Sequence, residues 1–226
     1  MNSKALDQTV GQMVAEQPDF ARLFEKLGID YCCGGKVLFA AACAAKNLDA
    51  QTVLHMLDLN LLSAFGHGER NWDTAGLSEL CNHIESTHHA YLKDELPRLM
   101  QIANKVASVH GEKDPALLDL ARVFEAFSNE LTEHMQKEEN GLFPLCRELE
   151  SSNARPLMHC GTVKNPVAVM EREHADAGDA LAEMRRLTHD FTPPDWACNT
   201  YRVLLQSLAK LEKDMHVHVH KENSIL

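Results

Sequence analysis

Two segments of the chain carry the same spacing of histidine and glutamate. In ELTEHMQKEENGLFP, His134 is followed four residues later by Glu138, and in DMHVHVHKENSIL, His218 is followed four residues later by Glu222. Residues four apart lie on one face of a helix, one turn above the other. The repeat therefore indicates two helix faces that present imidazole and carboxylate groups, which are typical metal ligands.

A single His–Glu pair could also belong to the solvated face of a helix. Because the pair recurs, we favour the interpretation that the two pairs are halves of one metal site. Two further helices then have to supply inward ligands, and the candidates are His83 in ELCNHIES and His174 in VMEREHADAG. The six predicted metal ligands are His83, His134, Glu138, His174, His218 and Glu222. If the two glutamates bridge two metal ions, each ion has four protein ligands, with room for a bridging oxide or hydroxide. Such ligands in a helical bundle typically hold di-iron or di-manganese, whereas structural zinc sites favour closely spaced cysteines.

Some assignments in the histidine-rich segments stay open. His216 and His220 also lie four residues apart, displaced by about half a turn, but the chosen pair repeats the earlier spacing. His88 and His89 could line the pocket, although the ligand count does not require them. Three acids are candidate acceptors for the ring nitrogens that do not bind metal: Glu79, Glu130 and Asp214.

A second candidate site is the pair of adjacent cysteines in the segment YCCGGK. Cys32 and Cys33 are followed by two glycines, which leave the sulfur atoms little cover, and then by a predicted helix. Thiols near a helix N-terminus have a lowered pKa and react more readily. The alternative is a glycine-rich turn with two incidental small residues. We favour a functional role for Cys32 and Cys33, in reversible oxidation or in binding iron or nitric oxide.

The elements that carry these residues are predicted to be helices. Strand-like alternation is weak, and aromatic residues make up only 6% of the chain. From Leu77 onward the apolar pattern predicts four long amphipathic helices, at about 77–108, 115–149, 166–190 and 194–224. Short helices are expected before them, one from Val10 with Thr9 as its N-cap and others at about 19–28, 37–46 and 49–62.

This pattern predicts an all-α protein with three parts. Residues 1–62 form a small N-terminal helical domain, residues 63–76 form a glycine-rich linker, and residues 77–226 form an up-down four-helix bundle.

Composition narrows the class of protein. The 226 residues include 33 acidic and 22 basic side chains, a net charge of −11, which argues against nucleic acid as a partner. The chain has no apolar run of about 18 residues, and its first residues lack the apolar core of a signal peptide, so we expect no membrane partner and a cytoplasmic protein. The seven cysteines fit that compartment as free thiols, and thirteen histidines favour metal binding.

With these motifs assembled, the sequence resembles the RIC family, the "repair of iron centres" proteins. The resemblance rests on LFEKLGIDYCCGGK, HMQKEENGLFP, VMEREHADAG and HVHKEN, and it covers nearly the whole chain. It implies a hemerythrin-like bundle that holds two non-haem iron ions per chain. The family's ligands carry over to the six residues named above, with the two glutamates as bridges, and its reactive cysteines carry over to Cys32 and Cys33.

The resemblance also implies a function, with alternatives. The first is a stress-response protein that restores iron-sulfur clusters damaged by nitric oxide or oxidants, with damaged iron-sulfur proteins as partners. The second is a buffer that binds nitric oxide or another diatomic molecule. The third is an enzyme that reduces nitric oxide to N2O at the di-iron centre. Whether the protein is an enzyme, and whether it is a monomer or a homodimer, stays open at this level.

Overall fold

The computed structural model describes residues 3–17, 19–31, 35–64, 72, 75–151, 164–224 and 226. Apart from one isolated bridge between Thr9 and Leu38, the regular structure in these ranges is helical, which confirms the predicted all-α class. The α-helices are α1 (Val10–Glu16), α2 (Phe20–Lys26), α3 (Phe39–Ala45), α4 (Ala50–Ala64), α5 (Leu77–Ile84), α6 (Ala90–His110), α7 (Ala116–Lys137), α8 (Phe143–Ser151), α9 (Lys164–Leu187) and α10 (Asn199–Ser224).

The chain divides into two compact units. One comprises Met1–Arg70 with Pro193–Gln206, and the other comprises Asn71–Thr192 with Ser207–Leu226. The first unit thus includes the start of α10, which the sequence assigned to the bundle. Most of the predicted linker at 63–76 lies outside the described residues.

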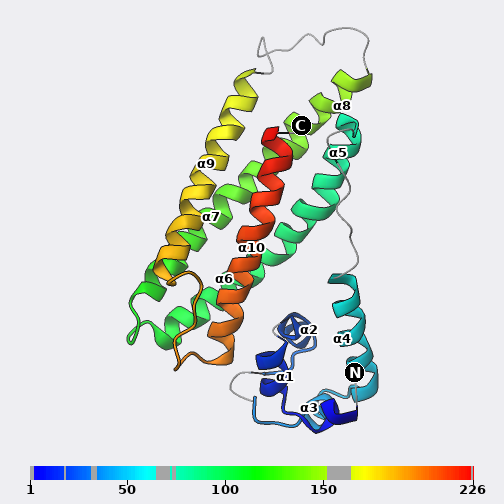
Figure 1. Cartoon of the computed structure of the whole chain (residues 1–226), viewed down its shortest axis with the longest axis vertical. Helices are drawn as coiled ribbons and strands as arrows, with labels where there is room; N and C mark the ends of the chain where they lie inside the picture. Colours follow the sequence, from blue (N-terminus) through cyan, green and yellow to red (C-terminus); the bar gives the residue numbers. More distant parts are fainter. Residues whose placement is uncertain are drawn as a thin grey trace. The chain divides into compact units, whose positions relative to one another are not determined.

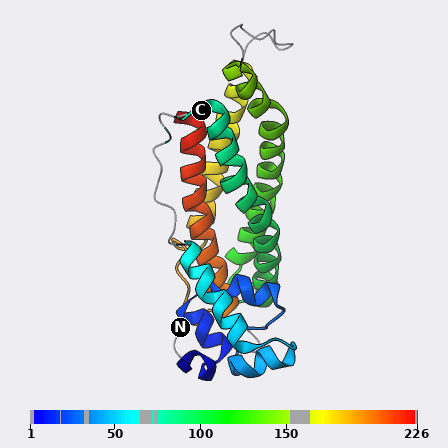
Figure 2. The same ribbon diagram turned by 90° about the vertical axis from the view of Figure 1, so that its right-hand side faces the viewer.

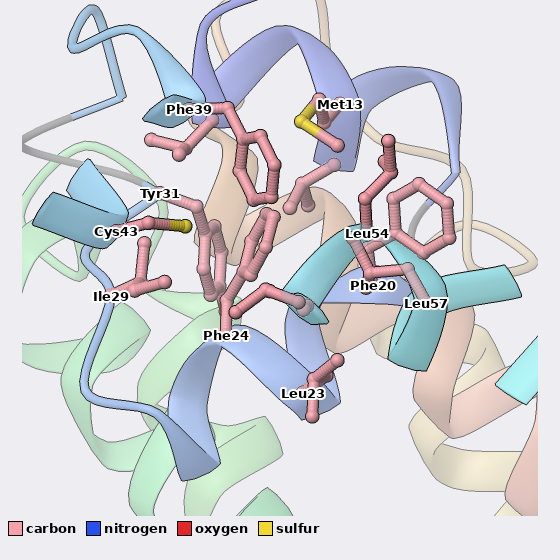
Figure 3. Close-up of a cluster of buried hydrophobic side chains, with 14 of the residues drawn as sticks. Met13, Phe20, Leu23, Phe24, Ile29, Tyr31, Phe39, Cys43, Leu54 and Leu57 are labelled. Atoms are coloured by element: carbon pink, nitrogen blue, oxygen red, sulfur yellow. The ribbon is translucent and has the colours of Figure 1, made fainter. Parts of the chain in front are cut away.

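The core of the first unit is a cluster of apolar side chains from α1 to α4 (Figure 3). Phe20, Phe24 and Phe39 are among its largest buried side chains. Thr9 caps α1 as predicted, because its side chain accepts from the Gln12 amide while the Gln12 side chain binds the Thr9 amide.

Three long helices, α6, α7 and α9, lie side by side in the second unit with the part of α10 that begins at Ser207 (Figures 1 and 2). The helix α10 begins five residues later than predicted. Pro193–Cys198 form an irregular segment instead, because the Arg202 side chain donates to the carbonyl oxygens of Pro194, Asp195 and Ala197. The bundle itself confirms the predicted four-helix architecture.

Two of the predicted long helices contain a π-helical turn. The first π-turn (η2, Glu85–His89) joins α5 to α6, and the second (η3, Glu138–Leu142) joins α7 to α8. A π-turn closes its hydrogen bonds over five residues instead of four, so it inserts one extra residue into the helical spiral. Each extra residue turns the following side chains by ~100° about the axis.

Within the described residues, no helix is both long and apolar enough to cross a lipid bilayer.

The first unit offers a test of its packing at Gly11. The Gly11 amide donates to the Gly35 carbonyl oxygen at 2.9 Å, and a Cβ at Gly11 would lie 2.7 Å from that oxygen. Gly11→Ala should therefore lower the free energy of unfolding by about 1–3 kcal/mol. Gly178→Ala, where an added Cβ meets nothing within 4 Å, should instead raise it by about 0.5–1 kcal/mol. Urea denaturation followed by circular dichroism measures both, and an unchanged Gly11→Ala protein would contradict the packing.

Candidate metal centre

Two groups of four side chains in the bundle each converge on one point. His89, Glu138, His218 and Glu222 form the first group, and His134, Glu138, His174 and Glu222 form the second. Within each group the candidate ligand atoms all lie within 4.8 Å of one another. Glu138 and Glu222 belong to both groups, so the two points are neighbours that share two carboxylates.

The two shared carboxylates each direct one oxygen to each group. Glu138 has Oε2 at 3.3 Å from His89 Nε2 and Oε1 at 3.4 Å from His134 Nε2. Glu222 has Oε1 at 2.7 Å from His218 Nε2 and Oε2 at 3.1 Å from His174 Nε2. This is the arrangement of carboxylates that bridge two metal ions.

The groups are buried, and their inward atoms lack hydrogen-bond partners. Glu138 and His89 are fully buried, and the Glu222 side chain is 3% exposed. Among the described residues, both oxygens of Glu138, both oxygens of Glu222 and His89 Nε2 make no hydrogen bond. Buried polar groups are nearly always paired, and a buried carboxylate without a partner is costly. A cation at each point would supply the missing partner.

The tautomers of two histidines support the same conclusion. His134 Nδ1 bonds to Glu173 Oε2 and His174 Nδ1 bonds to Asn223 Oδ1, both at 2.8 Å, so each Nδ1 carries the proton. In a neutral ring the other nitrogen, Nε2, then presents a lone pair. The two Nε2 atoms face each other at 3.0 Å. Two neutral rings would direct two lone pairs at each other here, so this point calls for a shared proton or for a metal ion that accepts both lone pairs.

Outer hydrogen bonds orient the histidine rings in the way that metal ligands require. His89 Nδ1 bonds to Glu139 Oε1 at 2.8 Å, and Lys93 holds Glu139. Glu173, the partner of His134, is likewise held by Lys137. The sequence offered Glu79, Glu130 and Asp214 for this role. For the histidines of the two groups the structure instead uses Glu139, Glu173 and Asn223, each of which directly neighbours a member of the groups, whereas Asp214 bonds to His88.

The electrostatics of the buried groups favour positive charge at the histidines. Burial lowers the pKa of His89, but the carboxylates of Glu138, Glu222 and Glu139 close to its ring nitrogens raise it to about 9. Burial raises the pKa of the Glu222 carboxyl, but the imidazoles of His174 and His218 beside it hold that pKa well below its ordinary range. Without metal, protons on the rings would balance the carboxylates. A metal ion competes with these protons for the same nitrogens.

A cavity of about 250 Å³ borders the second group and is lined in part by Phe127, Leu131, His134 and His174. A water molecule takes up about 30 Å³ in the liquid, so a diatomic molecule fits in this space beside the two histidines.

The structure brings together five of the six predicted ligands and leaves out His83. His89 takes its place in the first group. His83 instead stacks on Trp72, with ring centroids 3.9 Å apart, and its Nε2 lies 2.9 Å from Lys221 Nζ. The physical reason is the first π-turn, which follows His83 and changes the face on which later residues lie. The sequence contains no pattern that signals this turn.

The other predicted functional residues are placed as follows. Cys32 and Cys33 lie outside the described residues. The histidines of the alternative register, His216 and His220, belong to neither group. The free thiols among the described residues are Cys43, Cys81, Cys146 and Cys198, and the first three are buried.

Comparison with known proteins agrees with this site. Residues 6–60 match the model of the ScdA_N domain, a domain of unknown function, and residues 82–226 match that of the hemerythrin HHE cation binding domain. The iron-sulfur cluster repair protein YtfE of Edwardsiella ictaluri is 37% identical over 222 residues, which cover 97% of this chain and 95% of the relative. The chain belongs to the YtfE family. Proteins of the same name from Pectobacterium carotovorum and Dickeya chrysanthemi are 34% and 35% identical, again over 97% of this chain and 95% of the relative.

The family and the geometry together establish a metal-binding site in the bundle of this YtfE-family chain. The match with the hemerythrin domain model includes every residue of the two groups. It also confirms the hemerythrin-like bundle that the sequence predicted.

Metal affinity of this YtfE-family protein should increase with pH. His89 is protonated in the metal-free protein until the pH approaches about 9, above the ordinary histidine value of about 6.5. Metal binding must release that proton, so raising the pH through this range removes the competitor. Titration calorimetry with Co²⁺, in buffers of different ionisation enthalpy, measures the released protons. A Co²⁺ affinity that does not change with pH would contradict the raised pKa.

Proposed function

We propose that this protein repairs damaged iron-sulfur clusters, and that a di-iron centre in its bundle donates iron or removes nitric oxide. The relatives that match nearly the whole chain are named iron-sulfur cluster repair proteins. The observation that carries the proposal is the pair of four-ligand groups joined by two shared carboxylates.

In this proposal two non-haem iron ions bind per chain, with an oxo or hydroxo bridge between them. His89 and His218 would hold one iron and His134 and His174 the other, and Glu138 and Glu222 would be shared by both. Four neutral imidazoles and two carboxylates compensate only part of the charge of two divalent ions, which favours the ferrous state. Bound iron would supply ferrous ions for a damaged cluster, or a redox-active position for a diatomic molecule such as nitric oxide.

The thiols of Cys32 and Cys33 are proposed to handle transfer to the damaged protein. The residues that flank them are anchored within the first unit. The Tyr31 carbonyl oxygen accepts from the Asn199 side chain at 3.3 Å, and the Gly35 carbonyl oxygen accepts from the Gly11 amide at 2.9 Å. The cytoplasm, where thiols stay reduced, suits this role.

The cavity beside His134 and His174 supports a second candidate function, the binding or reduction of nitric oxide. Its size admits a diatomic molecule beside the rings of these two histidines, where Glu173 also lines the cavity. This function needs the bundle but not Cys32 and Cys33, so the two candidates separate experimentally.

The ligand assignment predicts different results for two neighbouring histidines. His89→Ala should lower the iron content from about two ions per chain to about one, because it removes a ligand of one position. His83→Ala should leave the iron content unchanged. Inductively coupled plasma spectrometry of the purified variants measures iron per chain. Loss of iron in His83→Ala with retention in His89→Ala would restore the assignment made from the sequence.

The repair function predicts recovery of an enzyme whose iron-sulfur cluster was damaged by nitric oxide. The iron-loaded protein should restore an aconitase-type enzyme faster than an equal concentration of ferrous salt. His134→Ala, which loses a ligand, should abolish this advantage. The double variant Cys32→Ala/Cys33→Ala should abolish it only if the thiols carry out transfer, with Cys198→Ala as the matched control. Recovery no faster than with ferrous salt would refute the repair proposal.

A further inference from the structure

Three further side chains lie beside the two groups of the metal centre, which together are called the paired site. Lys221 Nζ lies 2.9 Å from His83 Nε2 and 2.8 Å from His88 Nε2, so one ammonium group donates to two imidazoles. None of these three residues belongs to the two groups of the metal centre. The fold of the bundle therefore creates a third point at which histidine lone pairs converge.

The histidines at this point have the outer contacts of metal ligands. His88 Nδ1 bonds to Asp214 Oδ1 at 2.9 Å, which fixes the proton on Nδ1 and directs the Nε2 lone pair inward. His83 Nδ1 lies 3.2 Å from Thr87 Oγ1, and its ring stacks on Trp72. Both rings are thus oriented before any cation arrives.

The first π-turn explains why the two rings meet. His83 and His88 are five residues apart, and in an ordinary α-helix such residues point in different directions. Across a π-turn, residues five apart lie on the same face. The turn at Glu85–His89 therefore aligns His83 with His88 and at the same time moves His89 into the first group.

We propose that His83 and His88 form a third metal-binding position, in which the ammonium of Lys221 is the resident cation. The ligand class is a divalent transition metal ion that prefers imidazole, such as Co²⁺, Zn²⁺ or Fe²⁺. Lys221 is partly exposed, so its charged end can leave for solvent without crossing the core. While it stays, it keeps these two imidazoles from competing with the paired site for metal.

Lys221 is well placed for this role because it precedes Glu222 on α10. Glu222 faces the paired site, and Lys221 faces the two outer histidines. The His88 ring also stacks on His218, with centroids 5.0 Å apart and planes at 4°. The third position is thus separated from the first group by one layer of imidazole rings.

The test replaces the resident cation and counts metal ions. Lys221→Met removes the ammonium and keeps the length of the side chain. The metal-free variant should bind about three Co²⁺ ions per chain, whereas the wild type binds about two, because the freed histidines accept the extra ion. Lys221→Arg, which keeps a cation, and Lys213→Met, which removes an exposed lysine from the same helix, should both resemble the wild type.

A double variant shows where the extra ion binds. Lys221→Met/His83→Phe keeps a ring that stacks on Trp72 but removes one ligand, so the count should return to about two ions per chain. Absorption spectra of Co²⁺ and metal analysis after gel filtration give the counts, and circular dichroism confirms folding.

Two results would overturn the proposal. One is a Lys221→Met protein that binds no more Co²⁺ than the wild type. The other is a third ion that persists in the double variant, since it then binds elsewhere. The expected number of Co²⁺ ions per chain rests on the paired site proposed above. If the paired site fails, the number bound by the wild type changes. If the third position fails, only the number bound by Lys221→Met changes.

Discussion

Two buried carboxylates whose neighbouring basic groups are imidazoles are the constraint on which this structure depends. Each ion buried away from water costs several kcal/mol unless a compensating charge is close. Other buried acids of the bundle meet this requirement with arginine, as Glu95 does with Arg98 and Glu212 with Arg185. Glu138 and Glu222 instead face histidines, whose charge depends on protons or on metal. The centre of the bundle therefore needs either protons on these imidazoles or metal ions beside the carboxylates to balance its charge.

This requirement accounts for the first π-turn. Four histidines and two glutamates have to point at the same region, and regular helices of 3.6 residues per turn cannot direct every one of them there. The first π-turn ends at His89, and the second begins at Glu138. The first brings His89 toward the paired site at the cost of irregular backbone hydrogen bonding, whereas the second begins only where the regular spacing has already placed His134 and Glu138 on one face. π-turns commonly occur at functional sites for this reason.

The sequence was sufficient for those features that follow ordinary helical periodicity. The four-helix bundle, the N-cap at Thr9 and the two His–Glu pairs all depend on spacings of three and four residues. His174 was found because its helix offered almost no other inward histidine. The failure at His83 has a definite cause, since a π-turn leaves no mark in the pattern of apolar residues. The outer acceptors were missed because they directly neighbour the proposed ligands, a position that helical periodicity places on another face.

The histidines of the paired site differ from His83 and His88 in the charge of the group that lies next to the Nε2 atom. In the paired site each inward Nε2 atom has a carboxylate oxygen about 3 Å away, so a metal ion is attracted by imidazole and carboxylate together. At His83 and His88 the neighbouring group is an ammonium, which already supplies the positive charge. Both sets include rings that are held by outer partners, and His88 and His89, one from each set, are adjacent in the first π-turn. Lys221 and Glu222 are adjacent on α10 and carry opposite charges. The histidines beside Lys221 therefore already contact a cation, whereas the histidines beside Glu222 share an anion that attracts one.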